Sequence, residues 1–245
     1  MAKLPIIMKE KQVVQEAFTE LSSHYEKTVG GELNTFWGWS YQKFIDQLID
    51  RTEIQENHKI LDIATGTSVI PRKIIIKKIP GIHITGLDIT ESMLRIGKQK
   101  ISASKFNSSI SLTCGDAMAL PFTGQAFDVV VSGLASHHMN IPLMLSEMKR
   151  VIKPGGMLSI IDVAISPIWE NPVVRGAARI GAFLYFLFKE NPTRARAEFE
   201  APINVRTPEG WKTELETAGF QSIKITELPS KNSWMPEPLT IQSIS

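Results

Sequence analysis

The sequence contains one cysteine, Cys114, among its 245 residues. A lone cysteine forms no intrachain disulfide, and without clustered Cys and His ligands we expect no metal site. The chain also has no large excess of one charge, because 27 Lys and Arg oppose 25 Asp and Glu and leave a formal net charge of +2. This balance gives no electrostatic reason to expect a nucleic-acid partner. We therefore expect a small-molecule partner, and we leave open a homodimer.

Long hydrophobic runs are also absent. The most apolar stretch, 180–188, has roughly half the length of a membrane span, and Arg179 and Lys189 flank it. The apolar stretch near the N-terminus is too short for a signal peptide. We predict a cytoplasmic protein without stable membrane insertion, and leave open contact of this helix with a membrane surface.

The composition that is present, 43% hydrophobic and 21% charged, is typical of a soluble globular protein. The length favours a single α/β domain with a full core. We divide that domain into an N-terminal helical lid, a cofactor-binding core, a helical insertion or substrate lid, and a C-terminal helix with two strands. These parts span 1–55, 56–165, 166–206 and 207–245.

Short apolar runs alternate with amphipathic stretches from residue 59 onward. We predict strands at 59–64, 82–89, 110–116, 127–133 and 156–165, and helices near 69–79, 91–103 and 141–152. This alternation predicts a parallel sheet with helices on both faces. The preceding segments 8–29 and 40–52 have helical spacing, and we expect their glycine- and aromatic-rich link, 29–39, to be a lid segment and not core.

Four prolines interrupt this alternation around an apolar helix that we predict at 173–190. The alternation resumes with a helix that has Thr207 as N-cap, Pro208 as its first residue and Gly219 as its stop. Two strands, 221–228 and 237–245, follow it.

A small-residue turn, Ala64-Thr65-Gly66-Thr67-Ser68, joins the first predicted strand to a helix. Such a turn brings backbone N–H groups to the carboxyl edge of a parallel sheet, where ligands of α/β proteins bind. The signal alone is weak, because nicotinamide, flavin and S-adenosylmethionine enzymes all use such a turn.

Acidic residues then follow successive strands. Asp88 lies 22 residues after Gly66, where a carboxylate accepts hydrogen bonds from ribose hydroxyls. Asp116 follows the third strand and is a candidate acceptor for an adenine amino group. Taken singly, these acids and Asp62 also fit capping or strand-end roles.

The segments "LDIATGTS", "GLDIT", "CGDAMALPF", "FDVVVSGLASHHM" and "LSEMKRVIKPGGMLSIID" resemble class I S-adenosylmethionine-dependent methyltransferases. The resemblance is greatest to the ubiquinone/menaquinone-biosynthesis group and its small-molecule relatives, closely over 59–165 and loosely over 207–245. It implies a Rossmann-like, seven-stranded, mostly parallel sheet whose last strand is antiparallel, and S-adenosylmethionine as cofactor. The expected cofactor site comprises Tyr25, Asp62, Ala64, Thr65, Gly66, Thr67, Ser68, Asp88, Ile89, Met93, Asp116, Ala117, Met118, Ser132 and Gly133.

The turn departs from the family's usual Gly-x-Gly-x-Gly, because Ala64 and Ser68 occupy the outer positions. We expect Ser68 either to crowd the methionine end of the cofactor or to replace a backbone contact with its hydroxyl. Val69 argues against a dinucleotide fingerprint, since its β-branch hinders close helix–strand packing.

His137 and His138 follow the fourth strand, beside the expected position of the sulfonium. Either is a candidate general base for a phenol or enol, with packing against adenosine or the sheet as the alternative. Aromatic residues of the two lid segments are candidates for an apolar substrate pocket, or for packing of lid or subunit. They are Trp37, Trp39, Trp169, Phe183, Tyr185 and Phe186.

The implied reaction is an in-line methyl transfer to a small, apolar or quinone-like molecule, with S-adenosylhomocysteine as product. Three alternatives stay open: a non-methylating S-adenosylmethionine enzyme such as a cyclase or decarboxylase, a nicotinamide oxidoreductase, and a non-catalytic binding protein with this fold.

Overall fold

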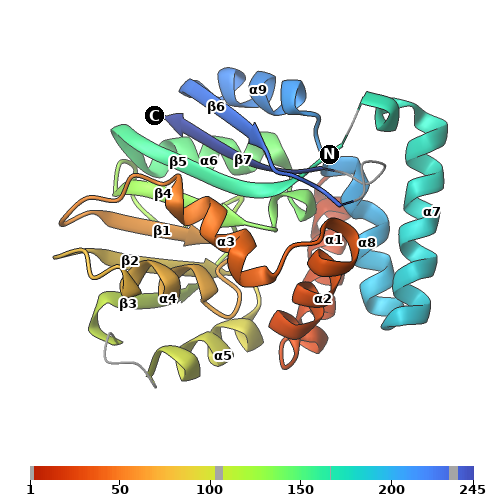
Figure 1. Ribbon diagram of the computed structural model, residues 1–245, viewed down its shortest axis with the longest axis horizontal. Helices are drawn as coiled ribbons and strands as arrows, with labels where there is room; N and C mark the ends of the chain where they lie inside the picture. The colour runs from red at the N-terminus through yellow and green to blue at the C-terminus, as the bar shows by residue number, and fades with distance from the viewer. Residues whose placement is uncertain (1–2, 103–106, 166, 232–236) are drawn as a thin grey trace.

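A seven-stranded sheet forms the centre of the computed structural model, which describes residues 3–102, 107–165, 167–231 and 237–245 (Figure 1). The strand order is β3-β2-β1-β4-β5-β7-β6. Strands β1 to β5 pair in parallel, and β7 runs antiparallel to β5 and β6. This confirms the predicted sheet. The strands are β1 (Lys59–Ile63), β2 (His83–Asp88), β3 (Ile110–Cys114), β4 (Phe127–Gly133), β5 (Ile152–Ala164), β6 (Gln221–Glu227) and β7 (Glu237–Ile244).

Helices cover both faces of this sheet. Because successive strand residues point to opposite faces, Ile60 packs into one hydrophobic cluster and Leu61 into the other. The first cluster includes side chains of α3 (Tyr41–Asp50), α4 (Val69–Ile76) and α5 (Glu91–Ser102), and the second those of α6 (Ile141–Val151) and α9 (Pro208–Thr217). Residues 1, 2, 103 and 166, which bound or fall within predicted segments, lie outside the described residues.

The start and end of α9 follow the predicted signals. Thr207 is the N-cap, and its hydroxyl accepts a hydrogen bond from the Gly210 N–H at 3.0 Å. Pro208 is the first helical residue, and Gly219 adopts φ +83° just beyond the helix, in the left-handed region that favours glycine.

Four helices gather at the end of the sheet toward which the parallel strands point (Figure 1). We call them the cap helices: α1 (Lys3–Leu21), α2 (Tyr25–Trp37), α7 (Pro172–Lys189) and α8 (Pro192–Asn204). The predicted continuous helix over 8–29 is wrong, because a turn at Ser22–His24 separates α1 from α2. The exclusion of 29–39 from the core is also wrong, because Val29 and Leu33 are buried on α2.

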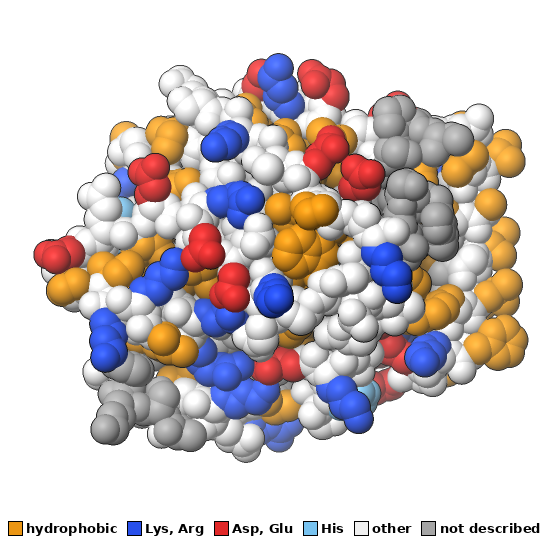
Figure 2. Space-filling model, viewed as in Figure 1, with side chains coloured by type: hydrophobic (Ala, Val, Ile, Leu, Met, Phe, Trp, Pro, Cys, Tyr) orange, Lys and Arg blue, Asp and Glu red, His pale blue; other side chains and the backbone are white. Residues whose placement is uncertain are grey.

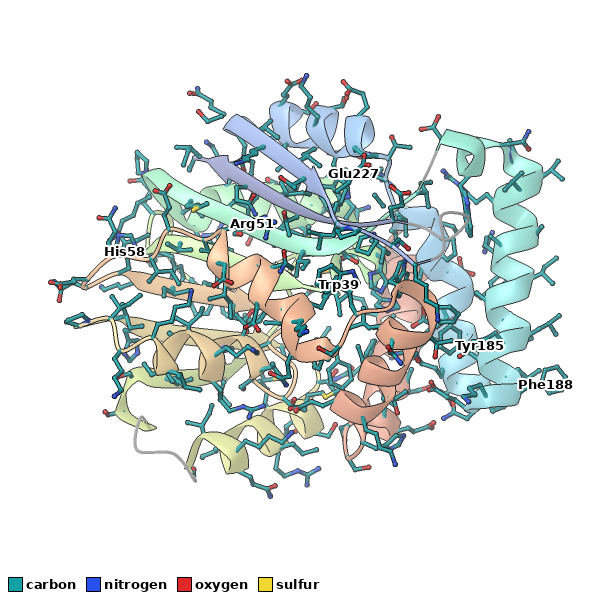
Figure 3. All side chains as sticks on the ribbon, viewed as in Figure 1. Trp39, Arg51, His58, Tyr185, Phe188 and Glu227 are labelled. Carbon is teal, nitrogen blue, oxygen red and sulfur yellow. The ribbon has the colours of Figure 1, made fainter. Side chains whose placement is uncertain are left out.

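Helix α7 is the outermost cap helix, and its outer face is apolar. Val173, Ile180, Leu184 and Phe188 are exposed on it, and hydrophobic side chains line this edge in Figure 2. Phe188 points away from the body, whereas Tyr185 lies on the inner side (Figure 3). Among the described residues, none of the helices has both the length and the apolar character needed to cross a bilayer.

Candidate functional site

A small cavity of about 60 Å³ lies at the carboxyl ends of the strands. It brings together six of the predicted cofactor residues: Ala64, Asp88, Ile89, Asp116, Ala117 and Met118. Lys11 and Val14 of α1 cover it, and His138 and Met139, after β4, close one side. Because parallel strands end at a common edge, residues far apart in the sequence meet here.

Asp88 links the tip of β2 to the turn after β1. One carboxylate oxygen accepts a hydrogen bond from the Gly66 N–H and the other from the Thr90 N–H, both at 2.8 Å. These bonds fix the turn. Burial of the Asp88 carboxyl outweighs them and raises its pKa.

The turn itself holds two non-glycine residues in the left-handed region, Ala64 at φ +57° and Ser68 at φ +62°. Ser68 is fully buried, and a Cβ added to Gly97 of α5 would lie 2.4 Å from its Oγ. The side chain therefore points into the core toward α5. Glycine at position 97 leaves room for this hydroxyl.

Asp62 sits within β1 with its carboxylate completely buried. Neither of its oxygens has a hydrogen-bond partner among the residues that the structure describes. Burial raises the pKa of this carboxyl to about 8. Burial disfavours the charged form of a carboxyl that has no partner, so a ligand with a cationic group would favour its ionised form.

Asp116 is held from two sides. Its Oδ1 accepts a hydrogen bond from the Met118 N–H at 2.9 Å, and its Oδ2 binds the ammonium group of Lys11 on α1. Gln15, one turn along α1, donates to the Ile89 carbonyl at 3.0 Å. These contacts hold α1 across the small cavity.

Other predicted cofactor residues lie around the turn or in the core. The Thr67 hydroxyl donates to Glu26 at 2.6 Å, and an added Cβ on Gly66 would lie 3.9 Å from the Tyr25 ring. Thr65 is buried in the turn. Three further residues pack in the interior and line neither described cavity: Met93, Ser132 and Gly133.

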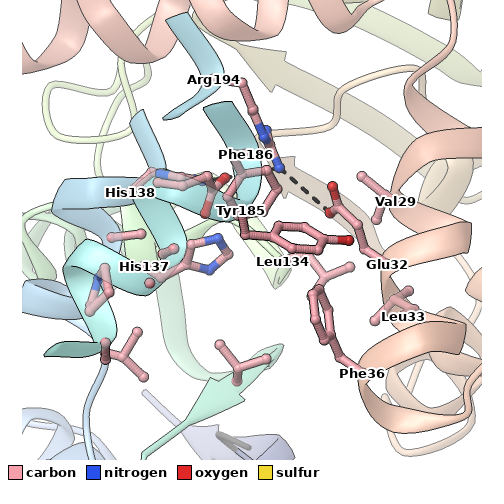
Figure 4. Close-up of a pocket in the computed structure, with 18 of the residues that line it drawn as sticks. Val29, Glu32, Leu33, Phe36, Leu134, His137, His138, Tyr185, Phe186 and Arg194 are labelled. Atoms are coloured by element: carbon pink, nitrogen blue, oxygen red, sulfur yellow. Dashed lines mark ion pairs between the residues drawn. The ribbon is translucent and has the colours of Figure 1, made fainter. Parts of the chain in front are cut away.

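A larger cavity of about 410 Å³ lies among the cap helices (Figure 4). Four of the six predicted aromatic residues line it: Trp37, Trp169, Tyr185 and Phe186. The other two lie elsewhere. Trp39 donates a hydrogen bond to the Pro229 carbonyl at 2.8 Å, and Phe183 packs against Phe199 with ring centroids 6.0 Å apart.

A small group of charged side chains borders this mostly apolar cavity. Nη2 of Arg194 lies 2.9 Å from Oε1 of Glu198 and 3.7 Å from Oε2 of Glu32. The guanidinium group also lies between two rings, 4.9 Å from the Phe18 centroid and 5.3 Å from that of Phe186. Burial raises the pKa of Glu32 to about 8.

The adjacent histidines have opposite pKa shifts. Burial lowers the pKa of His137, but the nearby Asp162 carboxylate, 2.7 Å from Nδ1, outweighs burial and raises it. Burial and the charge of His137 lower the pKa of His138. Such divergence is typical of groups with different protonation roles. His138 is therefore the neutral partner, able to accept a proton, and it lines both cavities.

His137, His138 and Glu198 also offer ligand atoms that lie within 4.8 Å of one another, a spacing compatible with a metal ion. The guanidinium group of Arg194 already pairs with this Glu198 carboxylate. Its positive charge disfavours a second cation at that place.

Sequence reasoning missed Glu32, Arg194 and Glu198 as cavity residues. Arg194 and Glu198 are spaced i,i+4 on α8, a pattern typical of a solvated helix face. Their burial depends on the packing of α8 against α1 and the segment that holds the histidines.

Comparisons with known proteins find a family and several relatives of this chain. The ubiE/COQ5 methyltransferase family matches residues 6–176. A demethylmenaquinone methyltransferase of Staphylococcus haemolyticus is 30% identical over 227 residues, which cover 88% of this chain and 89% of the relative. One from Symbiobacterium thermophilum is 30% identical over 178 residues, 72% of this chain and 66% of the relative.

The fold has solved counterparts. A geranyl diphosphate C-methyltransferase from Streptomyces coelicolor, in complex with Mg²⁺, geranyl diphosphate and S-adenosyl-L-homocysteine, superposes with a TM-score of 0.67. The sequence identity is 14%, over 91% of this chain and 84% of that chain.

Proposed function

Because the chain belongs to the ubiE/COQ5 methyltransferase family, we propose that it transfers a methyl group from S-adenosylmethionine to a ring carbon of an apolar hydroquinone. One observation carries the proposal: His138 lines both the small cavity at the sheet edge and the large apolar cavity. A donor in the first and an acceptor in the second would meet beside this side chain.

The polar groups of the small cavity and its turn suit the cofactor, but about 60 Å³ is far below the roughly 300–1,000 Å³ of small-molecule sites. Helix α1, whose Lys11 binds Asp116, would therefore have to move for the cofactor to enter. When bound, S-adenosylmethionine supplies an activated methyl group on a positively charged sulfur. The buried carboxylate of Asp62 has no hydrogen-bond partner among the described residues and would pair with the cofactor's ammonium group. Asp88 would bind the ribose hydroxyls, and Asp116 with the backbone of Ala117 and Met118 would hold the adenine.

The large cavity suits a ring-shaped acceptor. Its volume of about 410 Å³ falls within the range of roughly 300–1,000 Å³ for small-molecule sites. Its wall is aromatic and aliphatic, with Trp37, Trp169 and Tyr185 among the contributors. The relatives that are demethylmenaquinone methyltransferases support a quinone-type acceptor.

The polar border of the large cavity supports proton transfer. His138, neutral because its pKa is lowered, accepts the proton of the acceptor hydroxyl and so raises electron density on the neighbouring ring carbon. The cap helices exclude water and hold the ring in line. Such alignment supplies roughly 7–11 kcal/mol, whereas a positioned base contributes about 10²–10⁴-fold in rate. Alignment is therefore the larger contribution.

The test uses the purified protein, S-adenosylmethionine and 2-prenyl-1,4-naphthohydroquinone under anaerobic, reducing conditions. We expect S-adenosylhomocysteine to form in step with a product that is heavier by one methyl group. Cofactor binding without S-adenosylhomocysteine, together with an isomerised or decarboxylated probe, would favour the non-methylating alternative. Absence of cofactor binding by calorimetry would overturn the assignment.

A further inference from the structure

Helix α8 lies beyond the part of the chain that matches the family, which ends at residue 176. It nevertheless packs against the short helix Ser136–His138 that carries both histidines. Its Glu198 carboxylate lies beside His138, with Oε1 3.5 Å from Nε2. The polar border of the acceptor cavity therefore depends on a segment outside the residues that the family model matches.

We propose that Glu198, held in place by Arg194, is a positioning residue that stabilises positive charge on His138 as it takes a proton from the acceptor. This inference rests on the proposed function. In the step, the O–H bond of the acceptor breaks, its electron pair stays on the oxygen, and an N–H bond forms on the imidazole. Glu198 neither gains nor loses a proton.

The distance suits a contact that strengthens during the reaction. At 3.5 Å the two atoms are farther apart than in an ordinary hydrogen bond of about 2.7–3.2 Å. With a neutral imidazole the pair interacts weakly. Once the ring carries a second proton, a charged pair forms in a largely buried place, where charge-assisted contacts are stronger. Only interactions that grow toward the transition state raise the rate.

Arg194 fixes the position of this carboxylate. The side chain of Arg194 is only 6% exposed, and its Nη2 lies 2.9 Å from the same Oε1 that faces His138. Rings of Phe18 and Phe186 flank the guanidinium group and restrict its movement. The carboxylate thus approaches the histidine from a side chain that has little freedom to move.

The other charged groups near His138 already have hydrogen-bond or ion-pair partners. Asp162 of β5 accepts bonds from His137, from the Ser136 N–H and hydroxyl, and from the Val163 N–H. Glu32 of α2 lies on the far side of Arg194 (Figure 4). Lys11 of α1 binds Asp116. Among the described residues, Glu198 is therefore the carboxylate placed to stabilise a positive charge on His138.

The test compares Glu198→Gln with Glu200→Gln. Glu200 lies on the same helix and forms an Arg–Glu pair of equal length, 2.9 Å, with Arg179, but has no contact with the histidines among the interactions of the described residues. Nuclear magnetic resonance follows the titration of the His138 imidazole in protein saturated with S-adenosylhomocysteine. We expect Glu198→Gln to lower this pKa by about one unit, a tenfold loss of protonated form at fixed pH, and Glu200→Gln to leave it unchanged.

Activity gives a second readout. With 2-prenyl-1,4-naphthohydroquinone as probe, Glu198→Gln should reduce kcat about 10- to 100-fold, with S-adenosylhomocysteine affinity unchanged, and Glu198→Asp should recover part of the loss. An unaltered His138 titration in a folded Glu198→Gln protein would overturn the inference, as would an equal effect of Glu200→Gln. If the wild-type protein does not methylate the probe, the proposed function fails, but the titration still decides the role of Glu198.

Discussion

Individual residues of the turn after β1, residues 64–68, carry backbone strain that glycine would relieve. Ala64 and Ser68 have φ of +57° and +62°, where a Cβ costs roughly 1–2 kcal/mol. They occupy the outer positions of the Gly-x-Gly-x-Gly pattern, so the geometry explains why glycine is usual there. Ser68 in addition fits its hydroxyl against Gly97, so Ala64 is the simpler position to test.

Ala64→Gly should stabilise the protein. The free energy gained by relief of the left-handed strain exceeds the cost of the added conformational entropy of the unfolded chain. That cost is about 0.4–1 kcal/mol. A net gain of about 0.5–1 kcal/mol raises the melting temperature by a few degrees. Differential scanning calorimetry measures the change. The reverse exchange, Gly66→Ala at φ +53°, should lower the melting temperature, and a rise in both variants would contradict this account.

Asp62→Asn should have opposite effects on stability and on binding. The pKa of Asp62 is raised to about 8 from 3.8, so the ligand-free protein loses stability as pH rises between these values. The amide cannot ionise. In urea unfolding, the free energy of unfolding of the variant should therefore rise relative to that of the wild type from pH 5 to pH 8. S-adenosylhomocysteine binding should weaken about 10- to 100-fold, because a charged hydrogen bond of about 1.5–3 kcal/mol is lost. Equal affinity in both proteins would remove Asp62 from the cofactor site.

The sequence was sufficient to predict residues whose role follows from strand ends. Asp88 and Asp116 meet at one cavity because parallel strands share an edge. Glu32, Arg194 and Glu198 were beyond prediction. Charged residues at helical spacing usually face water, and only the packing of α8 onto α1 and the histidine segment places Arg194 and Glu198 inside.

At the scale of elements, α2 connects the two cavities. Its Tyr25, Val29 and Glu32 line the large cavity, while Glu26 binds the turn after β1 and the helices α4 and α5. One oxygen of Glu26 accepts bonds from the Thr67 hydroxyl at 2.6 Å, from Arg72 at 2.9 Å and from Lys100 at 2.6 Å. Movement of the turn would therefore also move α2 and the side chains by which it lines the larger cavity.

Glu26→Gln should remove an acid-sensitive part of the stability. Burial raises the pKa of Glu26, but the bonds from Lys100 and Thr67 outweigh burial and lower it. A lowered carboxyl pKa gives stability that is present above the unfolded value of 4.5 and is lost as pH falls through the folded value. Thermal unfolding from pH 7 to pH 3 should show the variant less stable at pH 7 and the two curves converging in acid. Glu16→Gln, an exposed position on α1, serves as control; a constant gap at every pH would refute the prediction.

Element prediction succeeded where one periodicity dominates. The strands and the helices α4, α5, α6 and α9 all lie close to their predicted ranges. It failed at 22–24, where apolar spacing continues across the turn between α1 and α2. Helix α8 was missed because Pro192 and Pro202 suggested interruption, whereas Pro192 occupies the first helical position, where proline is tolerated.

In the whole molecule, segments far apart in the sequence enclose two separate cavities that meet at His138. Of these two cavities, helix α7 lines only the large one, through its inner residues Ala178, Ala182, Tyr185 and Phe186. Its outer face is exposed (Figure 2). The large cavity can therefore be altered from α7 without change to the residues that line the small cavity.

Ala182→Trp should fill the large cavity and leave the small one intact. The indole would occupy volume that the acceptor needs, so the affinity for 2-prenyl-1,4-naphthohydroquinone should fall at least tenfold, while calorimetry gives an unchanged affinity for S-adenosylhomocysteine. Ala177→Trp is the matched control, because Ala177 is exposed on the same helix and should affect neither ligand. Loss of S-adenosylhomocysteine binding in a folded Ala182→Trp protein would mean that the cofactor extends into the large cavity. The separation into donor and acceptor chambers would then be wrong.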